Sequence, residues 1–203
     1  MIGIVGGTFD PIHNGHLCPV FRLSKDIPFD RVHYVLSARP PHRTTPSASI
    51  HHRYRMLELA LEPYSLFEAD DQEIVRPGPS FTIWTLRRLR QQYENHSLCL
   101  ILGLDAYLGI HKWYRWPDIA AMANIIVLTR PGWKLRDGVD GGDAQQMHIR
   151  TSGVVMFWNS LEMPIASTDI RRCIGNGEAT GEQMPTAVLN YIYANDIYGA
   201  NSL

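Results

Sequence analysis

Short apolar runs rich in Val, Ile and Leu recur along this chain of 203 residues. Each run is continuous rather than alternating in polarity, and they cover residues 2–5, 32–36, 98–102, 125–128 and 154–158. Continuous apolar runs of this length are typical of strands that are buried on both faces of a sheet. The pattern therefore predicts five buried strands.

Segments with apolar residues at helical spacing lie between these runs, at 16–25, 53–61, 83–93 and 117–123. Alternating strands and helices favour a parallel sheet covered by helices, and right-handed crossovers make such a sheet doubly wound. Two further helical patterns, at 168–174 and 185–194, follow near the end. We therefore expect one α/β domain over residues 1–203, with a doubly wound, Rossmann-like core at 1–160 and a small C-terminal helical part at 161–203. Residues 131–150, rich in Gly and Asp, predict a polar, mobile connection.

The charges of the chain nearly cancel, with 19 Lys and Arg against 20 Asp and Glu. This balance lacks the basic surface that a nucleic-acid polymer requires, although a few local arginines can still bind a small anion. The three cysteines, Cys18, Cys99 and Cys173, are far apart, which favours reduced thiols in the cytoplasm over a disulfide framework. No apolar stretch approaches twenty residues, so we expect no membrane span.

The stretch that follows the first apolar run combines glycines with two histidines three residues apart. Gly6 and Gly7 end the run, Gly15 lies just inside the next helical segment, and His13 and His16 share one helical face. A tight turn, a metal site and a cradle for phosphate all remain possible. The histidine pair lacks the further ligands of a zinc site, and we expect no protein metal ligands. Phosphate is favoured, because glycines let a ligand approach the backbone and a helix N-terminus attracts anions. Neither a P-loop nor a GxGxxG motif is present.

A second polar stretch, residues 165–171, precedes a helical pattern near the C-terminus. Ser167 or Thr168 is a suitable N-cap residue, and this start would place Arg171 and Arg172 in the first helical turn. Cations in that turn oppose the helix dipole unless an anion binds there, so Arg171 is a candidate phosphate ligand. We expect Arg172 to point into solvent.

Residues 6–16 (GGTFDPIHNGH) resemble the signature of the nucleotidylyltransferase superfamily, and 165–171 (IASTDIR) resemble its second signature. Ala166 stands where the family often has Ser, and we expect little loss from this change. Motifs in the middle of the chain are similar to those of bacterial nicotinate mononucleotide adenylyltransferases. They are Pro40-Pro41-His42-Arg43, Pro79-Ser80-Phe81-Thr82, Gly103-Leu104-Asp105, Trp113-Tyr114 and Arg130-Pro131-Gly132.

The resemblance implies an enzyme that transfers the adenylyl group of ATP to nicotinate mononucleotide, by in-line attack and without a covalent enzyme intermediate. It implies catalytic roles for His16 at the α-phosphate, for His13 at the bridging or β-phosphate, and for Arg171 at the departing pyrophosphate. The implied ATP ligands are Gly6, Gly7, Thr8, Phe9, His13, Gly15, His16, Gly103, Asp105, Ile165, Ser167, Thr168 and Arg171. Mg²⁺ is expected to accompany ATP and to be held mainly by phosphate and water.

The acceptor, nicotinate mononucleotide, combines a flat ring, a carboxylate and a phosphate. The resemblance implies that Trp113 stacks on the ring and that backbone N–H groups near Thr82 and Tyr114 bind the carboxylate. His42, Arg43 and Arg130 are expected at the phosphate. Trp116 is expected to pack in the core.

Three alternatives remain open at this point. The acceptor could be the amide form of the mononucleotide or a phosphopantetheine, and a nucleotide sensor without catalysis would share the fold. Retention of His13, Gly15, His16 and Arg171 disfavours the sensor. The sequence leaves open whether the protein is a monomer or a homodimer.

Overall fold

A six-stranded parallel sheet forms the centre of the protein in this computed structural model, which describes residues 1–41, 45–129, 144–160 and 163–200. The strands are β1 (Ile2–Gly7), β2 (Arg31–Leu36), β3 (Phe67–Asp70), β4 (Leu98–Gly103), β5 (Asn124–Thr129) and β6 (Val155–Asn159), in the order β3-β2-β1-β4-β5-β6. The doubly wound, Rossmann-like sheet expected from the sequence is thereby confirmed. The direction in which strands are added reverses between β1 and β4, and sheets of this kind bind ligands beyond the carboxyl ends of the strands at such a point.

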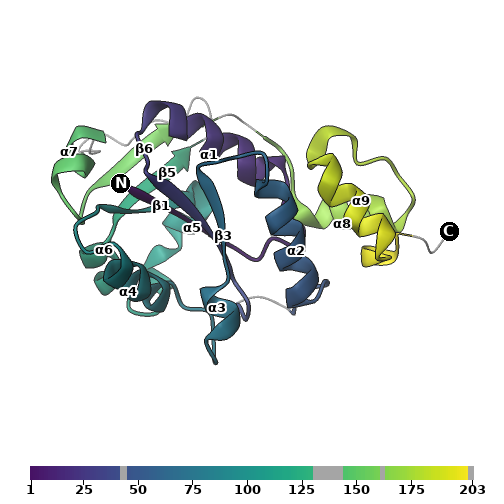
Figure 1. Cartoon of the computed structure of the whole chain (residues 1–203), viewed down its shortest axis with the longest axis horizontal. Helices are drawn as coiled ribbons and strands as arrows, with labels where there is room; N and C mark the ends of the chain where they lie inside the picture. Colours follow the sequence, from purple (N-terminus) through teal and green to yellow (C-terminus); the bar gives the residue numbers. More distant parts are fainter. Residues whose placement is uncertain (42–44, 130–143, 161–162, 201–203) are drawn as a thin grey trace.

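Helices cover both faces of the sheet (Figure 1). They are α1 (Asn14–Asp26), α2 (Ile50–Leu61), α3 (Gln72–Val75), α4 (Thr82–Gln92), α5 (Leu104–Leu108), α6 (Trp116–Met122), α7 (Ala144–Ile149), α8 (Ser167–Gly175) and α9 (Thr186–Ala194). The last two lie together at one end of the molecule, beyond α2. None of the described helices is long and apolar enough to cross a membrane.

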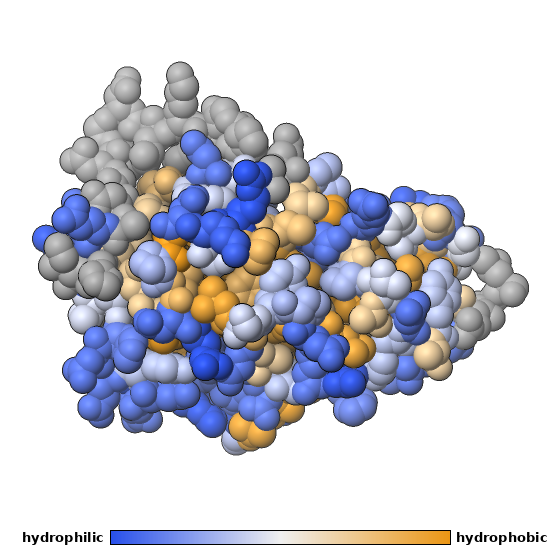
Figure 2. All heavy atoms as spheres, turned by 45° about the horizontal axis from the view of Figure 1, so that its top comes forward, coloured by the Kyte–Doolittle hydropathy of each residue, from blue (hydrophilic) through white to orange (hydrophobic). Residues whose placement is uncertain are grey.

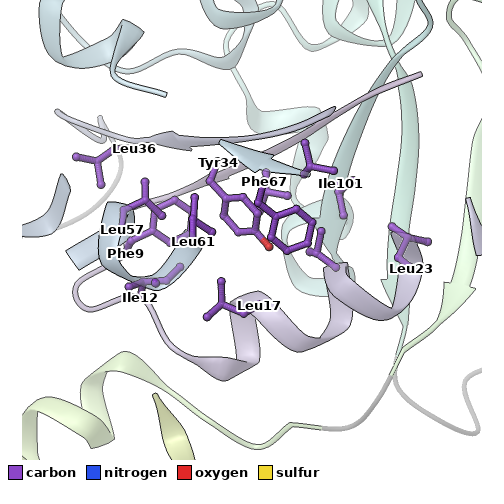
Figure 3. Packing of buried hydrophobic residues seen from close by; sticks show 14 of the residues in the cluster. Phe9, Ile12, Leu17, Leu23, Tyr34, Leu36, Leu57, Leu61, Phe67 and Ile101 are labelled. Atoms are coloured by element: carbon purple, nitrogen blue, oxygen red, sulfur yellow. The ribbon is translucent and has the colours of Figure 1, made fainter. Parts of the chain in front are cut away.

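Alternate residues of each central strand enter two separate hydrophobic clusters. Along β4, Cys99 and Ile101 join the cluster beneath α1 and α2, whereas Leu98 and Leu100 join the cluster beneath α4 and α6. Figure 3 shows the first cluster, where Tyr34 lies between the sheet and α1. Burial of each large aliphatic side chain stabilises the fold by about 1.5–3 kcal/mol. The first cluster also contains residues of α8 and α9, so these helices share the core of the sheet.

Polar residues cover most of the surface seen in Figure 2, and apolar residues show mainly in its middle. The sequence-based prediction was wrong at two places. It missed β3, an edge strand with only two apolar residues, Phe67 and Ala69. It also assigned all of 131–150 to a connection, whereas Ala144–Ile149 form α7, with Met147 fully buried against the core. Residues 131–143 of that connection lie outside the described residues.

Candidate active site

The turn after β1 lies at the reversal point of the sheet and is shaped by glycine. A Cβ atom on Gly7 would lie 2.5 Å from the ring of Phe9, so only glycine lets this buried ring fold back onto the strand. Phe9 itself has a left-handed backbone, with φ of 46°. A Cβ atom on Gly6 would meet nothing within 4 Å, so the backbone here borders open space. A ligand can therefore approach the main chain closely at the end of β1.

His13 and His16 lie at the start of α1 with their rings stacked, 3.7 Å apart between centroids. The backbone N–H of His13 donates to Nδ1 of His16 at 3.3 Å. Because Nδ1 accepts this bond, a neutral His16 carries its proton on Nε2, which is then a donor. Tyr34 donates its hydroxyl to the carbonyl oxygen of His16 at 3.2 Å, which fixes the helix start against the sheet.

Burial determines the state of His13. The residue is 4% exposed, and burial lowers the pKa of its imidazole from 6.5 to about 4, because the charged form is poorly solvated there. Its Nδ1 is buried and has no hydrogen-bond partner within the described part of the chain. A Cβ atom on Gly15 would lie 3.0 Å from this ring, so the glycine makes room for it. The neutral imidazole of His13, stacked on the ring of His16, suits hydrogen bonding to phosphate oxygens.

The second signature packs directly against the first turn. Ser167 donates its hydroxyl to the carbonyl oxygen of Pro11 at 3.1 Å, and Arg171 Nη1 donates to the carbonyl oxygen of Asp10 at 2.7 Å. Nη2 of Arg171 also lies 3.4 Å from the hydroxyl of Thr168. Residues that are about 150 positions apart thus form one side of a single site.

Two predictions about this helix were wrong. Its N-cap is Ala166, which has no capping side chain, because Ser167 and Thr168 already belong to α8 and use their hydroxyls elsewhere. With Ser167 as the first residue, Arg171 falls in the second turn and Arg172 in the last, where a cation suits the helix dipole. Arg172 is exposed as expected and pairs with Glu178 at 3.4 Å.

Asp10 is part of the site, although the sequence did not indicate it. It is buried, and its carboxylate accepts hydrogen bonds from the N–H groups of Ser47 at 2.7 Å and Ala48 at 3.0 Å and from the hydroxyl of Tyr198 at 2.7 Å. Asp10 therefore ties the first turn to the segment before α2 and to the C-terminal end. A lone Asp in the sequence gives no sign of these distant partners.

Arg53 is a second residue that the sequence did not reveal. It is 1% exposed and donates to the carbonyl oxygens of Thr8 at 2.8 Å, Ser37 at 2.9 Å and Ala38 at 3.2 Å. Arg53 holds the carbonyl oxygen of Thr8 in a fixed direction. Because a trans peptide group is planar, the N–H of Phe9 in the same group then points in the opposite direction. Burial lowers the pKa of Arg53, and Asp10 raises it. Arg53 thus sets the orientation of the loops after β1 and β2.

A cavity of about 280 Å³ lies next to the glycine turn, at the carboxyl ends of β1, β2 and β4. Thr82, Trp113 and Tyr114 line it, as do residues of the turn itself, Gly6 and Thr8. Trp113 is half-buried, and the Tyr114 ring lies 4.6 Å from that of Phe81 between centroids. Three residues from separate parts of the sequence that were expected at the acceptor thus share one cavity.

The other residues expected at the site lie in separate elements of the fold. Gly103 is the N-cap of α5, and Asp105 is exposed in the first turn of that helix. Ile165 lies 3.5 Å from the Cβ position that Gly15 lacks. His42, Arg43 and Arg130 lie outside the described residues. Trp116 is 40% exposed, so its expected place in the core was wrong, because α6 begins at this residue and its buried side is formed by Ile119.

The geometry places a glycine turn and a stacked histidine pair beside an aromatic-lined cavity on a doubly wound sheet. The model of the cytidylyltransferase-like family matches residues 4–173, and the chain therefore belongs to that family.

The chain is similar to named relatives and to solved structures. A protein of Methylococcus capsulatus is 36% identical over 98% of this chain and 99% of its own length, and one of Yersinia enterocolitica is 35% identical over 98% and 95%. Both carry the name "probable nicotinate-nucleotide adenylyltransferase". The structure of Plasmodium falciparum nicotinic acid mononucleotide adenylyltransferase with NaAD covers 100% of this chain and 98% of its own, with a TM-score of 0.78. At 17% identity, that likeness shows the fold. The resemblance inferred from the motifs is confirmed, and the chain is a nucleotidyltransferase.

Proposed function

We propose that this protein transfers the adenylyl group of ATP to nicotinate mononucleotide, giving nicotinate adenine dinucleotide and pyrophosphate in NAD biosynthesis. One observation carries the proposal: the cavity lined by Thr82, Trp113 and Tyr114 opens onto the glycine turn before His13 and His16. An acceptor in this cavity lies beside the phosphates of a nucleotide bound at the turn. The names of the relatives support the same pair of substrates.

The acceptor's nicotinate ring fits the wall of the cavity. The face of Trp113 offers a stacking surface, and Thr82 is the first residue of α4. The first N–H groups of a helix have no partner within it, so they are available to a carboxylate. Arg43 and Arg130, with His42, are proposed to bind the 5′-phosphate.

ATP is proposed to lie across the turn and the start of α1, with its phosphates on the main chain from Gly6 to Phe9. The partial positive charge at the start of this 13-residue helix favours phosphate there. Asp105 is proposed to bind the ribose, and the main chain around Ile165 and Ser167 the adenine.

Catalysis is proposed to rest on position and charge. The attacking phosphate is largely ionised at neutral pH, since its second pKa is near 6, so neither a protein nucleophile nor a strong base is required. Nε2–H of His16 is proposed to donate to the α-phosphate as charge builds, with His13 assisting at the bridging or β-phosphate. Arg171 is proposed to stabilise the leaving pyrophosphate. Its side chain is 27% exposed, so its guanidinium is within reach of a ligand.

Mg²⁺ is proposed to enter with ATP. Within the described residues, no three His, Cys, Asp or Glu side chains form a group that could hold a metal. Asp10, the carboxylate of the turn, already accepts three hydrogen bonds. The ion is therefore proposed to be held mainly by phosphate oxygens and water, where it neutralises phosphate charge.

The test is pyrophosphate release from ATP and Mg²⁺ with the acid or the amide mononucleotide as acceptor. We expect strong release with the acid and weak release with the amide. Trp113→Ala should raise the KM for the mononucleotide far more than the KM for ATP. Release with neither acceptor would refute the proposal. Release with phosphopantetheine instead would identify phosphopantetheine as the acceptor. Equal effects on both KM values would assign Trp113 a structural role.

A further inference from the structure

Glu73, in α3, is a buried carboxylate on the wall of the acceptor cavity. It is 7% exposed, and its Oε1 accepts a short hydrogen bond from the hydroxyl of Thr85 at 2.6 Å. Its other oxygen, Oε2, is buried and has no hydrogen-bond partner in the described part of the protein. A buried carboxylate with half of its bonding capacity unused is costly, so its presence at a ligand cavity requires an explanation.

The described part of the cavity lining provides no counter-charge for this group. Among the described residues that line the cavity, Glu73 is the only one with a charged side chain. The exposed Arg39 lies near, but its guanidinium donates to main-chain oxygens, including that of Glu73 itself at 3.2 Å and that of Arg76 at 3.0 Å. The remaining lining is apolar, aromatic or neutral and polar, so a charge on Glu73 is only weakly screened within the cavity.

The proposed acceptor carries the complementary charge. The ring nitrogen of nicotinate mononucleotide is bonded to ribose, which makes the ring a permanent pyridinium cation. Cations are attracted to the faces of aromatic rings, and Trp113 and Tyr114 provide such faces in the same cavity. The carboxylate of Glu73, which lines the same cavity, adds a Coulomb attraction that acts without direct contact.

We infer that Glu73 is a specificity-determining residue that selects the positively charged ring of the acceptor. The inference rests on the proposed function and extends it, because stacking on Trp113 accepts any flat ring, whereas the carboxylate distinguishes a pyridinium from a neutral aromatic ring. The ring keeps its charge during adenylyl transfer, so Glu73 acts on binding of the acceptor. Its loss should raise the KM for the mononucleotide and leave kcat nearly unchanged.

The test compares two acceptors with the same shape. One is nicotinate mononucleotide, and the other is its C-nucleoside isostere, in which a 3-carboxyphenyl ring replaces the pyridinium. Binding of each is measured by calorimetry in the parent, in Glu73→Gln and in Thr85→Val. Glu73→Gln keeps the size of the side chain and an acceptor for Thr85, whereas Thr85→Val removes that hydrogen bond and keeps the charge. Glu178→Gln, which removes an exposed carboxylate in the C-terminal part, is the matched charge control.

We expect the parent to prefer the charged ring by at least about tenfold in Kd. Glu73→Gln should reduce this preference by about tenfold, which corresponds to about 1.4 kcal/mol, while Thr85→Val and Glu178→Gln keep it. An unchanged preference in Glu73→Gln would overturn the inference, as would an equal loss in Thr85→Val. If Glu73→Gln does not fold, the binding of the two acceptors to the parent and to Thr85→Val is still measured. A parent that binds the charged and the neutral ring equally tightly refutes the inference. Pyrophosphate release by the parent distinguishes this failure from failure of the proposed function, since release would persist.

Discussion

The stability of this protein should depend on pH through one buried histidine of the candidate site. Burial lowers the pKa of His13 to about 4, whereas an unfolded chain titrates its histidines near 6.5. Between these two values the unfolded chain binds a proton that the native protein does not. Native stability contributed by the neutral ring is therefore present above pH 6.5 and lost as the pH falls from 6.5 to 4.

The size of the effect follows from the difference between the two pKa values. At 1.36 kcal/mol for each pH unit, the difference between 6.5 and about 4 sets an upper limit of roughly 3.4 kcal/mol. Solvent screens the ring little, because His13 is only 4% exposed. Between pH 7.5 and pH 5.0, linkage predicts that about 2 kcal/mol of this amount is lost.

Urea denaturation of the parent and of His13→Gln at pH 7.5, 6.5 and 5.0 measures this loss. The free energy of unfolding of the parent should fall by about 2 kcal/mol more than that of the variant over this range. Any destabilisation of the variant at pH 7.5 cancels, because only the change with pH is compared. His51→Gln, at an exposed histidine of α2, should follow the parent. Parallel curves for His13→Gln and the parent would refute the assignment of a buried, neutral His13.

Three further substitutions probe the same region. His16→Ala should lower kcat at least about 100-fold with a smaller effect on KM, because a transition-state donor is lost; a kcat within a few-fold of the parent would exclude this role. Gly7→Ala places a methyl group 2.5 Å from the ring of Phe9, so the turn must move, and we expect loss of ATP binding in calorimetry, which normal affinity would contradict. Arg53→Met leaves buried carbonyl oxygens without a donor and should cost about 3–5 kcal/mol in urea denaturation. A cost below about 1 kcal/mol would show that water replaces the guanidinium.

Hydrophobic patterning predicted the elements that contain enough apolar residues to form a run or a helical period, and it failed for two short elements that contain few. The strands β1, β2, β4 and β5 were found from their apolar runs, because helices cover both of their faces. The edge strand β6 was also found, because four of its five residues are apolar, although only Met156 is buried. Edge strand β3, with the sequence Phe-Glu-Ala-Asp, needs few apolar residues, since Phe67 alone is buried deeply in it. Short α7 sits in a stretch dominated by Gly and Asp, and its buried Met147 is too little to reveal a helical period.

The candidate site was predictable where its chemistry depends on local sequence. The spacing of His13 and His16 and the glycines around them imply a helix start with open backbone, and the structure has this arrangement. Thr82 and Trp113 line the same cavity. Only the resemblance to a known family predicted this, because their separation in the sequence does not imply that they are close in space. Glu73 lacked any sequence signal, because its burial depends on how α3 packs against α4.

The contacts of Asp10 show why the C-terminal helices belong to the chemistry of the site as well as to its core. Arg171 reaches the carbonyl oxygen of Asp10, and Tyr198 reaches its carboxylate, so two C-terminal residues converge on the first turn. The carboxylate also receives the N–H groups of Ser47 and Ala48, which come just before α2. A shift of the C-terminal helices would therefore remove a donor from a buried charge. Because Asp10 lies next to Phe9, this cost couples the position of the C-terminal helices to the shape of the glycine turn after β1.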